Sequence, residues 1–228
     1  SFSTIVITWL FLPETVDRKH KFKLSLDIFH IKQFKQFLFD SEISCKLWQF
    51  FTYSLAHVIW VSNLALFARA KVNANAQNIG WLLAYIGLIS IIFRGFLLQR
   101  LLKFIKEEWL QLFGIIFFML GLLGASFINK FWQLPIVMAF FSIGTGMSRP
   151  LLMGAISRSG ASRYQGSLMG VASSIGSLAQ IIGPIIGGYL LSNYASYSVS
   201  LASFLVISIG LFLFLRSCRA LKKYRTAL

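Results

Sequence analysis

Six apolar runs, each about as long as a membrane-spanning helix, dominate this sequence. A helix needs about twenty mainly apolar residues to cross the hydrocarbon core of a bilayer. Charged residues make up only 13% of the chain, against about a quarter in ordinary soluble domains. The sequence therefore predicts an all-α integral membrane protein with six transmembrane helices in a bundle at 48–215. The six runs are Trp48–Ala68, Ile79–Gln99, Leu110–Ile128, Phe131–Met153, Leu168–Leu191 and Val199–Leu215.

The formal net charge of +15 could reflect either nucleic-acid binding or membrane topology, and the placement of the basic residues decides between them. Of the 22 Lys and Arg, 18 lie in every second connection and three in the alternate ones, while Arg94 lies inside a run. Basic connections face the cytoplasm. We therefore expect no nucleic-acid partner, and a plasma- or inner-membrane protein with cytoplasmic linker and C-terminus. The basic connections are the linker at 13–47, the turn with Arg100, the turn with Arg149, Arg158 and Arg163, and the tail at 216–228.

The N-terminal segment at 1–12 is apolar but too short to span a bilayer. We interpret it as the end of a transmembrane helix that begins outside this sequence. In the linker that follows, apolar residues from Leu24 to Leu38 recur at helical spacing among lysines. This pattern fits either a helix lying on the membrane surface or a solvated connector, and both remain open.

Two pairs of glycines, each four residues apart, occur in the fifth apolar run. Gly166 and Gly170 form the first pair, and Gly183 and Gly187 the second. In apolar helices this spacing lets a neighbouring backbone approach closely. We expect all four glycines to pack helix against helix, and Gly183 with Pro184 to form a hinge.

Two stretches resemble parts of the major facilitator transporters. The fifth run resembles the eleventh transmembrane helix of that family, particularly of its tetracycline and multidrug efflux branch. Residues 13–15 resemble the stop that often closes the family's sixth helix. The resemblance implies the C-terminal half of a twelve-helix fold, whose N-terminal half would be a partner. The matching residues of the fifth run are Gln165, Gly166, Gly170, Ser174, Gly176 and the stretch 183–188.

The end of the second run resembles the family's cytoplasmic gating motif. Gly95 and Arg100 match it, whereas Gln99 stands where an acid is often found and Leu102 where a glycine is usual. Arg100 would either lock one conformational state or only enforce the orientation of the helix. Arg94 lies more than one turn inside the run, so it must extend towards the membrane surface or meet a partner.

A polar and aromatic stripe on the first run predicts one wall of a substrate cavity. Gln49, Tyr53, His57 and Trp60 recur at intervals of four, four and three residues, which places them on one helix face. At membrane depth such a face should point into a bundle rather than at lipid. His57 would bind a proton or the substrate, or it is a structural histidine bonded to a neighbouring helix.

Further candidate lining residues come from the fourth and fifth runs. Ser173, Ser177 and Gln180 share one helix face, and we expect Gln180 to contact substrate and Ser177 to serve in packing. Phe140 would suit an apolar or aromatic ligand, although such residues also serve in plain packing. The lipid bilayer and a small-molecule substrate are the partners that these residues predict.

No Asp or Glu occurs in any of the six runs. A coupling proton would therefore bind in the N-terminal half or on His57. The sequence shows no catalytic constellation and no metal-binding cluster, so we expect neither an enzyme nor a cofactor. The resemblance implies export of drugs or other amphipathic compounds in exchange for protons by alternating access. The alternatives are uptake of a sugar or an organic anion, a non-transporting scaffold or receptor, and a six-helix homodimer.

Overall fold

The computed structural model describes residues 41–159 and 165–225 of the chain. Its regular elements there are all helices, and they form six segments long and apolar enough to span a membrane. The π-helix η1 continues α4 into α5, so these three elements make one span. The prediction of an all-α bundle with six membrane-spanning helices is confirmed. The elements are α3 (Ser41–Val72), α4 (Ala76–Ile92), η1 (Phe93–Leu97), α5 (Leu98–Phe104), α6 (Glu107–Phe127), α7 (Gln133–Ser159), α8 (Gln165–Asn193) and α9 (Tyr197–Arg225).

Several helices extend beyond the apolar runs from which they were predicted. α3 begins at Ser41, inside the predicted linker at 13–47, and α9 continues to Arg225, inside the predicted tail at 216–228. Hydropathy detects only the part of a helix that needs an apolar solvent, so polar ends are missed. The predicted helix end at 1–12 and the predicted surface helix of the linker lie outside the described residues, as does Arg163.

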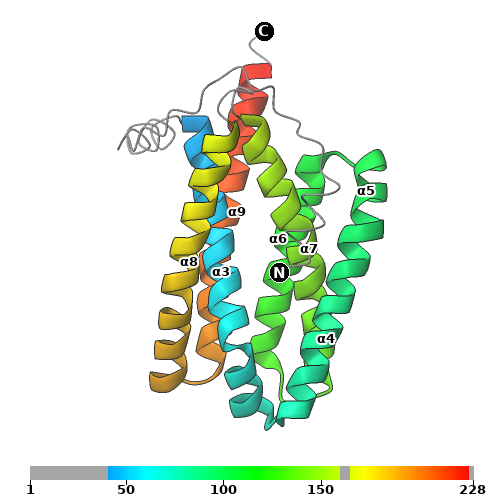
Figure 1. Cartoon of the computed structure of the whole chain (residues 1–228), viewed down its shortest axis with the longest axis vertical. Coiled ribbons are helices and arrows are strands. Elements are labelled where there is room, and N and C mark those ends of the chain that lie inside the picture. The colour runs from blue at the N-terminus through cyan, green and yellow to red at the C-terminus, as the bar shows by residue number, and fades with distance from the viewer. Residues whose placement is uncertain (1–40, 160–164, 226–228) are drawn as a thin grey trace, which may run out of the picture.

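The spans form two groups of three, which lie side by side in Figure 1. One group contains α3, α8 and α9, and the other contains α6, α7 and the span from α4 to α5. The groups meet where α3 contacts α7 and where α6 contacts α9. The start of α3 and the end of α9 lie at the same end of the bundle (Figure 1).

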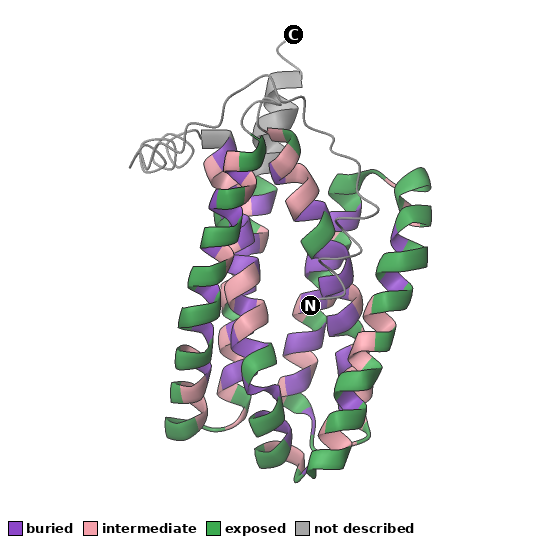
Figure 2. Cartoon of the chain, in the orientation of Figure 1, coloured by how far each residue is buried: buried purple, intermediate pink, exposed green. Residues whose placement is uncertain are grey.

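Burial follows the inner faces of the helices. In Figure 2 the buried positions line the helix contacts, whereas much of α4, α5 and α8 is exposed. Many of the exposed residues are large and apolar, including Trp81, Ile91 and Ile185. A water-soluble protein rarely exposes so much apolar surface, so lipid is the natural surroundings of these faces.

Glycines allow α6 and α7 to touch along their backbones. A Cβ atom added at Gly144 would overlap the backbone nitrogen of Phe118 and lie 2.7 Å from the carbonyl oxygen of Gly114. A Cβ added at Gly121 would lie 2.7 Å from the backbone nitrogen of Phe141. The absence of side chains at these positions therefore fixes the spacing of the two helices.

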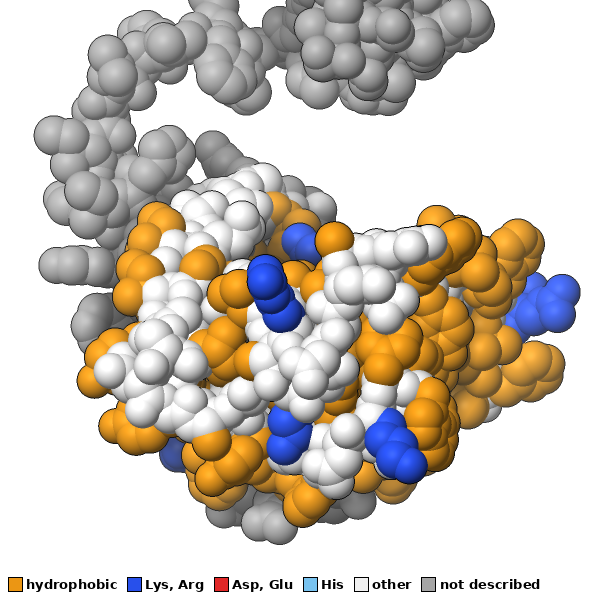
Figure 3. Space-filling view, turned by 90° about the horizontal axis from the view of Figure 1, so that it is seen from below, with side chains coloured by type: hydrophobic (Ala, Val, Ile, Leu, Met, Phe, Trp, Pro, Cys, Tyr) orange, Lys and Arg blue, Asp and Glu red, His pale blue; other side chains and the backbone are white. Residues whose placement is uncertain are grey.

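Short polar turns join the helices at the end of the bundle that Figure 3 shows. The side chain of Asn75 caps α4 by accepting a hydrogen bond of 2.8 Å from the backbone nitrogen of Asn78. The basic residues near these turns are Arg69, Lys71 and Lys130. In Figure 3 Lys and Arg lie among apolar side chains, and no Asp or Glu is seen among the described residues.

Candidate functional site

A pocket of about 370 Å³ opens between α3, α7 and α8. Three of the residues predicted to line a cavity meet here, namely Tyr53, His57 and Gln180. The other lining residues were not predicted for a cavity, and Arg149 is the charged one among them. The full lining is Phe50, Tyr53, Ser54, His57, Val58, Val61, Ser62, Arg149, Gly176 and Gln180.

An aromatic stack holds the imidazole of His57 in place. The ring lies between Tyr53 and Phe141, with ring centroids 6.0 Å and 5.8 Å away and interplanar angles of 25° and 17°. The hydroxyl of Tyr53 donates a hydrogen bond of 3.3 Å to the backbone oxygen of Thr145 on α7. The stack therefore bridges α3 and α7 and fixes the orientation of the histidine.

Arg149 lies deep within α7. It precedes the last residue of that helix, Ser159, by ten residues, which is about 15 Å at a rise of about 1.5 Å per residue. The sequence analysis assigned Arg149 to a cytoplasmic turn, and that assignment is wrong because α7 continues through Pro150. Within the described residues its side chain forms no hydrogen bond or ion pair. The sequence did hold a signal for this position, because the apolar run predicted at 131–153 contains Arg149.

Arg94 lies on the π-helix η1, next to α7. Its Cγ atom is 3.9 Å from the position that a Cβ on Gly146 would take. Arg94 and Arg149 are both near enough to Tyr53 and His57 to interact with them electrostatically. The side chain of Arg94 is exposed and has no ion pair among the residues that the structure describes. A π-helix inside an α-helix is often found at a functional site.

Two residues of the predicted α3 stripe lie in the core instead of the pocket. Gln49 is buried and contacts Cys45, and Trp60 is fully buried against Phe67 with ring centroids 4.9 Å apart. Neither residue is among those that line the pocket. That Gln49 and Trp60 line a substrate cavity stays a prediction, since in this structure both side chains are buried.

Three other candidates lie outside the pocket on exposed or partly packed surface. Phe140 is exposed and stacks on Phe117 of α6 with ring centroids 5.8 Å apart. Ser173 and Ser177 are exposed on α8, where the hydroxyl of Ser177 donates to the backbone oxygen of Ser173. Whether these residues contact a substrate stays a prediction.

The predicted gating residues Gly95 and Arg100 are both exposed, and the side chain of Arg100 forms no hydrogen bond or ion pair in the described segments. At the same end of the bundle, Arg158 of α7 forms an ion pair with Glu107 of α6. The ammonium of Lys46 donates a hydrogen bond of 2.6 Å to the hydroxyl of Ser159. Contacts at this end therefore come from α3, α6 and α7, and a gating role for Arg100 stays a prediction.

The two glycine pairs of α8 have different surroundings. A Cβ on Gly183 would lie 2.6 Å from Cγ1 of Val58, and one on Gly187 would overlap the side-chain amide of Asn63. In contrast, a Cβ on Gly166 or Gly170 would meet no atom within 4 Å. Within the described structure only the second pair lies against a neighbouring helix, and a packing role for the first pair stays a prediction. α8 continues as a helix through Pro184, and its role as a hinge stays a prediction.

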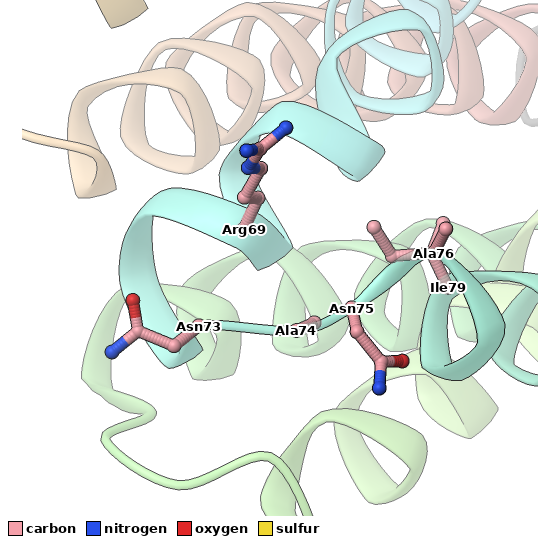
Figure 4. Close-up of a pocket in the computed structure, with 6 residues that line it drawn as sticks. All are labelled: Arg69, Asn73, Ala74, Asn75, Ala76 and Ile79. Carbon is pink, nitrogen blue, oxygen red and sulfur yellow. The ribbon is translucent and has the colours of Figure 1, made fainter.

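A second pocket, of about 470 Å³, lies at the turn between α3 and α4 (Figure 4). Arg69, Asn73 and Asn75 supply its longer polar side chains. Figure 4 shows the two asparagine side chains pointing away from that of Arg69, so these groups do not converge on one ligand. Among the residues described, no group of three or more His, Cys, Asp or Glu could hold a metal ion.

Sequence comparisons agree with this architecture. The family described as Major Facilitator Superfamily matches residues 47–226. The tetracycline resistance protein, class H, of Pasteurella multocida is 28% identical over 139 residues, which cover 61% of this chain and 34% of that protein. The class D protein of Salmonella ordonez is 27% identical over 147 residues, covering 64% of this chain and 37% of that protein.

A third relative is the quinolone resistance protein NorA of Staphylococcus aureus. It is 24% identical over 151 residues, which cover 64% of this chain and 39% of that protein. The matched regions thus span between a third and two fifths of these relatives. The family match covers most of the chain and coincides with the six spans. This integral membrane chain therefore belongs to the Major Facilitator Superfamily.

Proposed function

We propose that this chain is the C-terminal half of a secondary active transporter that exports drugs or other small amphipathic compounds in exchange for protons. Family membership favours a transporter over an enzyme. The names of the relatives, which are tetracycline and quinolone resistance proteins, support drugs as the substrate class.

The observation that carries this proposal is the polar pocket inside an apolar bundle. Arg149, His57 and Gln180 come from three different helices and meet beside an aromatic stack. Polar side chains at membrane depth usually face a water-filled path or a binding site. Family transporters bind their substrate near the middle of the membrane between two halves. The N-terminal half would close the open side of this pocket, and rocking of the halves would give alternating access.

The coupling proton has few sites to occupy in this half. The acids with described side chains, Glu107 and Glu108, lie in the first turn of α6, at the end of that span, and neither lines the pocket. His57 lines the pocket, and its imidazole is a side-chain group that can take up a proton. The proton therefore binds either to His57 or to a carboxylate of the N-terminal half.

Orientation follows from the basic residues. The helix ends near Arg100, Arg158 and Arg216 lie on the same side as the start of α3, whereas only Arg69, Lys71 and Lys130 lie at the other ends. The side with more Lys and Arg faces the cytoplasm by the positive-inside rule, and that side is the same when Arg149 is not counted. This count supports a plasma- or inner-membrane protein whose linker and C-terminus face the cytoplasm.

The proposal is tested by flux in vesicles that contain the full-length protein. A proton gradient is imposed, and the movement of a cationic fluorescent dye and of a fluorescent quinolone is followed. We expect at least one compound to be pumped against its gradient, and His57→Ala or Gln180→Ala to reduce pumping without loss of protein from the membrane. If neither compound moves under any gradient, the export function is refuted.

One alternative has a specific observation in its favour. The unpaired guanidinium of Arg149 in the pocket would also suit a carrier that takes up an organic anion. The same vesicles separate the two functions, because an uptake carrier moves its substrate towards the cytoplasmic side when the gradient drives it.

A further inference from the structure

The pocket carries positive charge without a negative partner in the described residues. Arg149 lines it, and Arg94 lies beside α7 with its Cγ atom 3.9 Å from the position that a Cβ on Gly146 would take. The acids with described side chains in the spans are Glu107 and Glu108 in the first turn of α6, and neither forms an ion pair with Arg94 or Arg149. Because a charge at membrane depth is costly, such residues usually meet an opposite charge or water.

Arg158 provides an internal comparison on the same helix. Arg149 and Arg158 are both exposed in the described structure, but Arg158 lies at the end of α7 and is already paired with Glu107. Arg149 lies about 13 Å further from that end, at about 1.5 Å per residue, and has no such pair among the described residues. The arginine at the more costly depth is therefore the one that has no carboxylate.

We propose that Arg149 binds a negatively charged group, such as a carboxylate, on an amphipathic substrate and so determines substrate specificity. This inference rests on the proposed transport function and names the class of compound that the same pocket takes. The guanidinium offers a planar set of donors that matches a carboxylate. Gln180 supplies a neutral hydrogen-bonding group, and the stack of Tyr53 and His57 supplies an aromatic wall for the rest of the molecule.

The test measures equilibrium binding of a fluorescent quinolone carboxylate and of its methyl ester to the detergent-solubilised full-length protein. The two probes share their ring system and differ in one negative charge. We expect the wild-type protein to bind the carboxylate about tenfold more tightly than the ester, as one charge-assisted hydrogen bond would give. Arg149→Gln should weaken carboxylate binding by about tenfold and ester binding by less than about twofold.

Two further variants separate charge recognition from folding. Arg149→Lys keeps the charge and should recover part of the carboxylate affinity, whereas Arg158→Gln should bind both probes like the wild type. If the Arg149 variants do not fold, the inference is tested by the wild-type protein alone, through its affinity for the carboxylate relative to that for the ester. The inference is overturned if the ester binds as tightly as the carboxylate, if the carboxylate does not bind, or if Arg149→Gln weakens both equally. Equal binding would show that a carboxylate of the protein itself neutralises Arg149.

The binding measurement tests this inference and the flux measurement tests the export function, so one claim can be refuted while the other is supported. Charge-selective binding without proton-driven flux would support this inference and refute the export function. Proton-driven flux of both probes without any charge preference would support the export function and overturn this inference.

Discussion

Two faces of α7 show how one helix can serve packing and binding. Its Gly144 meets the backbone of α6 so closely that no side chain fits, whereas Arg149, five residues later, lines a polar pocket against α3 and α8. The first contact is made by backbone atoms and involves no charged group. The second leaves a charge without a partner in the described structure. The difference implies that changes at the first face should alter stability, and changes at the second should alter binding.

The largest expected effect is on the packed face. Gly144→Ala would force a methyl group against the backbone of Phe118 and Gly114, which can yield only if the helices separate. We expect a loss of about 3 kcal/mol in the free energy of unfolding, at the upper end for overpacking. Unfolding of the purified protein in detergent measures it. Gly87→Ala is the matched control because its new methyl group meets no atom within 4 Å. Equal stability of both variants would contradict the account of this face.

A smaller loss of stability is expected where α8 meets α3. Gly187→Ala places a methyl group against the side-chain amide of Asn63, which donates a hydrogen bond of 3.0 Å to Ile59 and is buried. Because a side chain can shift more easily than a backbone, we expect a loss of about 1.5 kcal/mol. Gly170→Ala, in open space on the same helix, should be at least as stable as the wild type. The same unfolding measurement compares them, and an equal loss in both would remove the distinction between the two glycine pairs.

On the binding face, His57→Phe tests the polar atoms of the imidazole. Phenylalanine keeps an aromatic ring between Tyr53 and Phe141 but removes both ring nitrogens. We expect stability to be retained and quinolone binding to weaken by about fivefold, as the loss of one neutral hydrogen bond of about 1 kcal/mol would give. Fluorescence titration measures the affinity. Unchanged affinity would show that His57 has only a structural role.

The smallest effect is expected at the end of α7. The side chains of Arg158 and Glu107 are 58% and 47% exposed, so their ion pair is screened by water. Glu107→Gln should therefore change the free energy of unfolding by less than about 1 kcal/mol and leave binding unchanged. Thermal unfolding at low and high salt checks this, and a loss comparable to that of Gly144→Ala would show that the account underestimates this contact.

The sequence predicted the number of spans because each requires a long apolar run, and it predicted Tyr53, His57 and Gln180 because polar residues are rare in such runs. The sequence alone could not predict contacts that depend on which neighbouring helix a residue faces. Trp60 shares a stripe with His57, yet packing against Phe67 buries it. Gly170 and Gly187 have the same local pattern, but only Gly187 faces another described helix. Arg149 was missed because a basic residue near the end of a run is equally typical of a turn.

The central claim, that the pocket between α3, α7 and α8 binds the transported compound, is tested most directly by protection of a cysteine from labelling. Gln180→Cys lies in the pocket, and Ser192→Cys lies about 18 Å further along α8, at about 1.5 Å per residue, as the control. Both are made in a background with Cys45→Ser and Cys218→Ser, and a water-soluble maleimide is applied to the full-length protein. The account predicts that saturating quinolone slows labelling at position 180 by about tenfold and leaves position 192 unchanged, as occupancy above about 90% would require. Labelling of position 180 at the same rate with and without quinolone would contradict it.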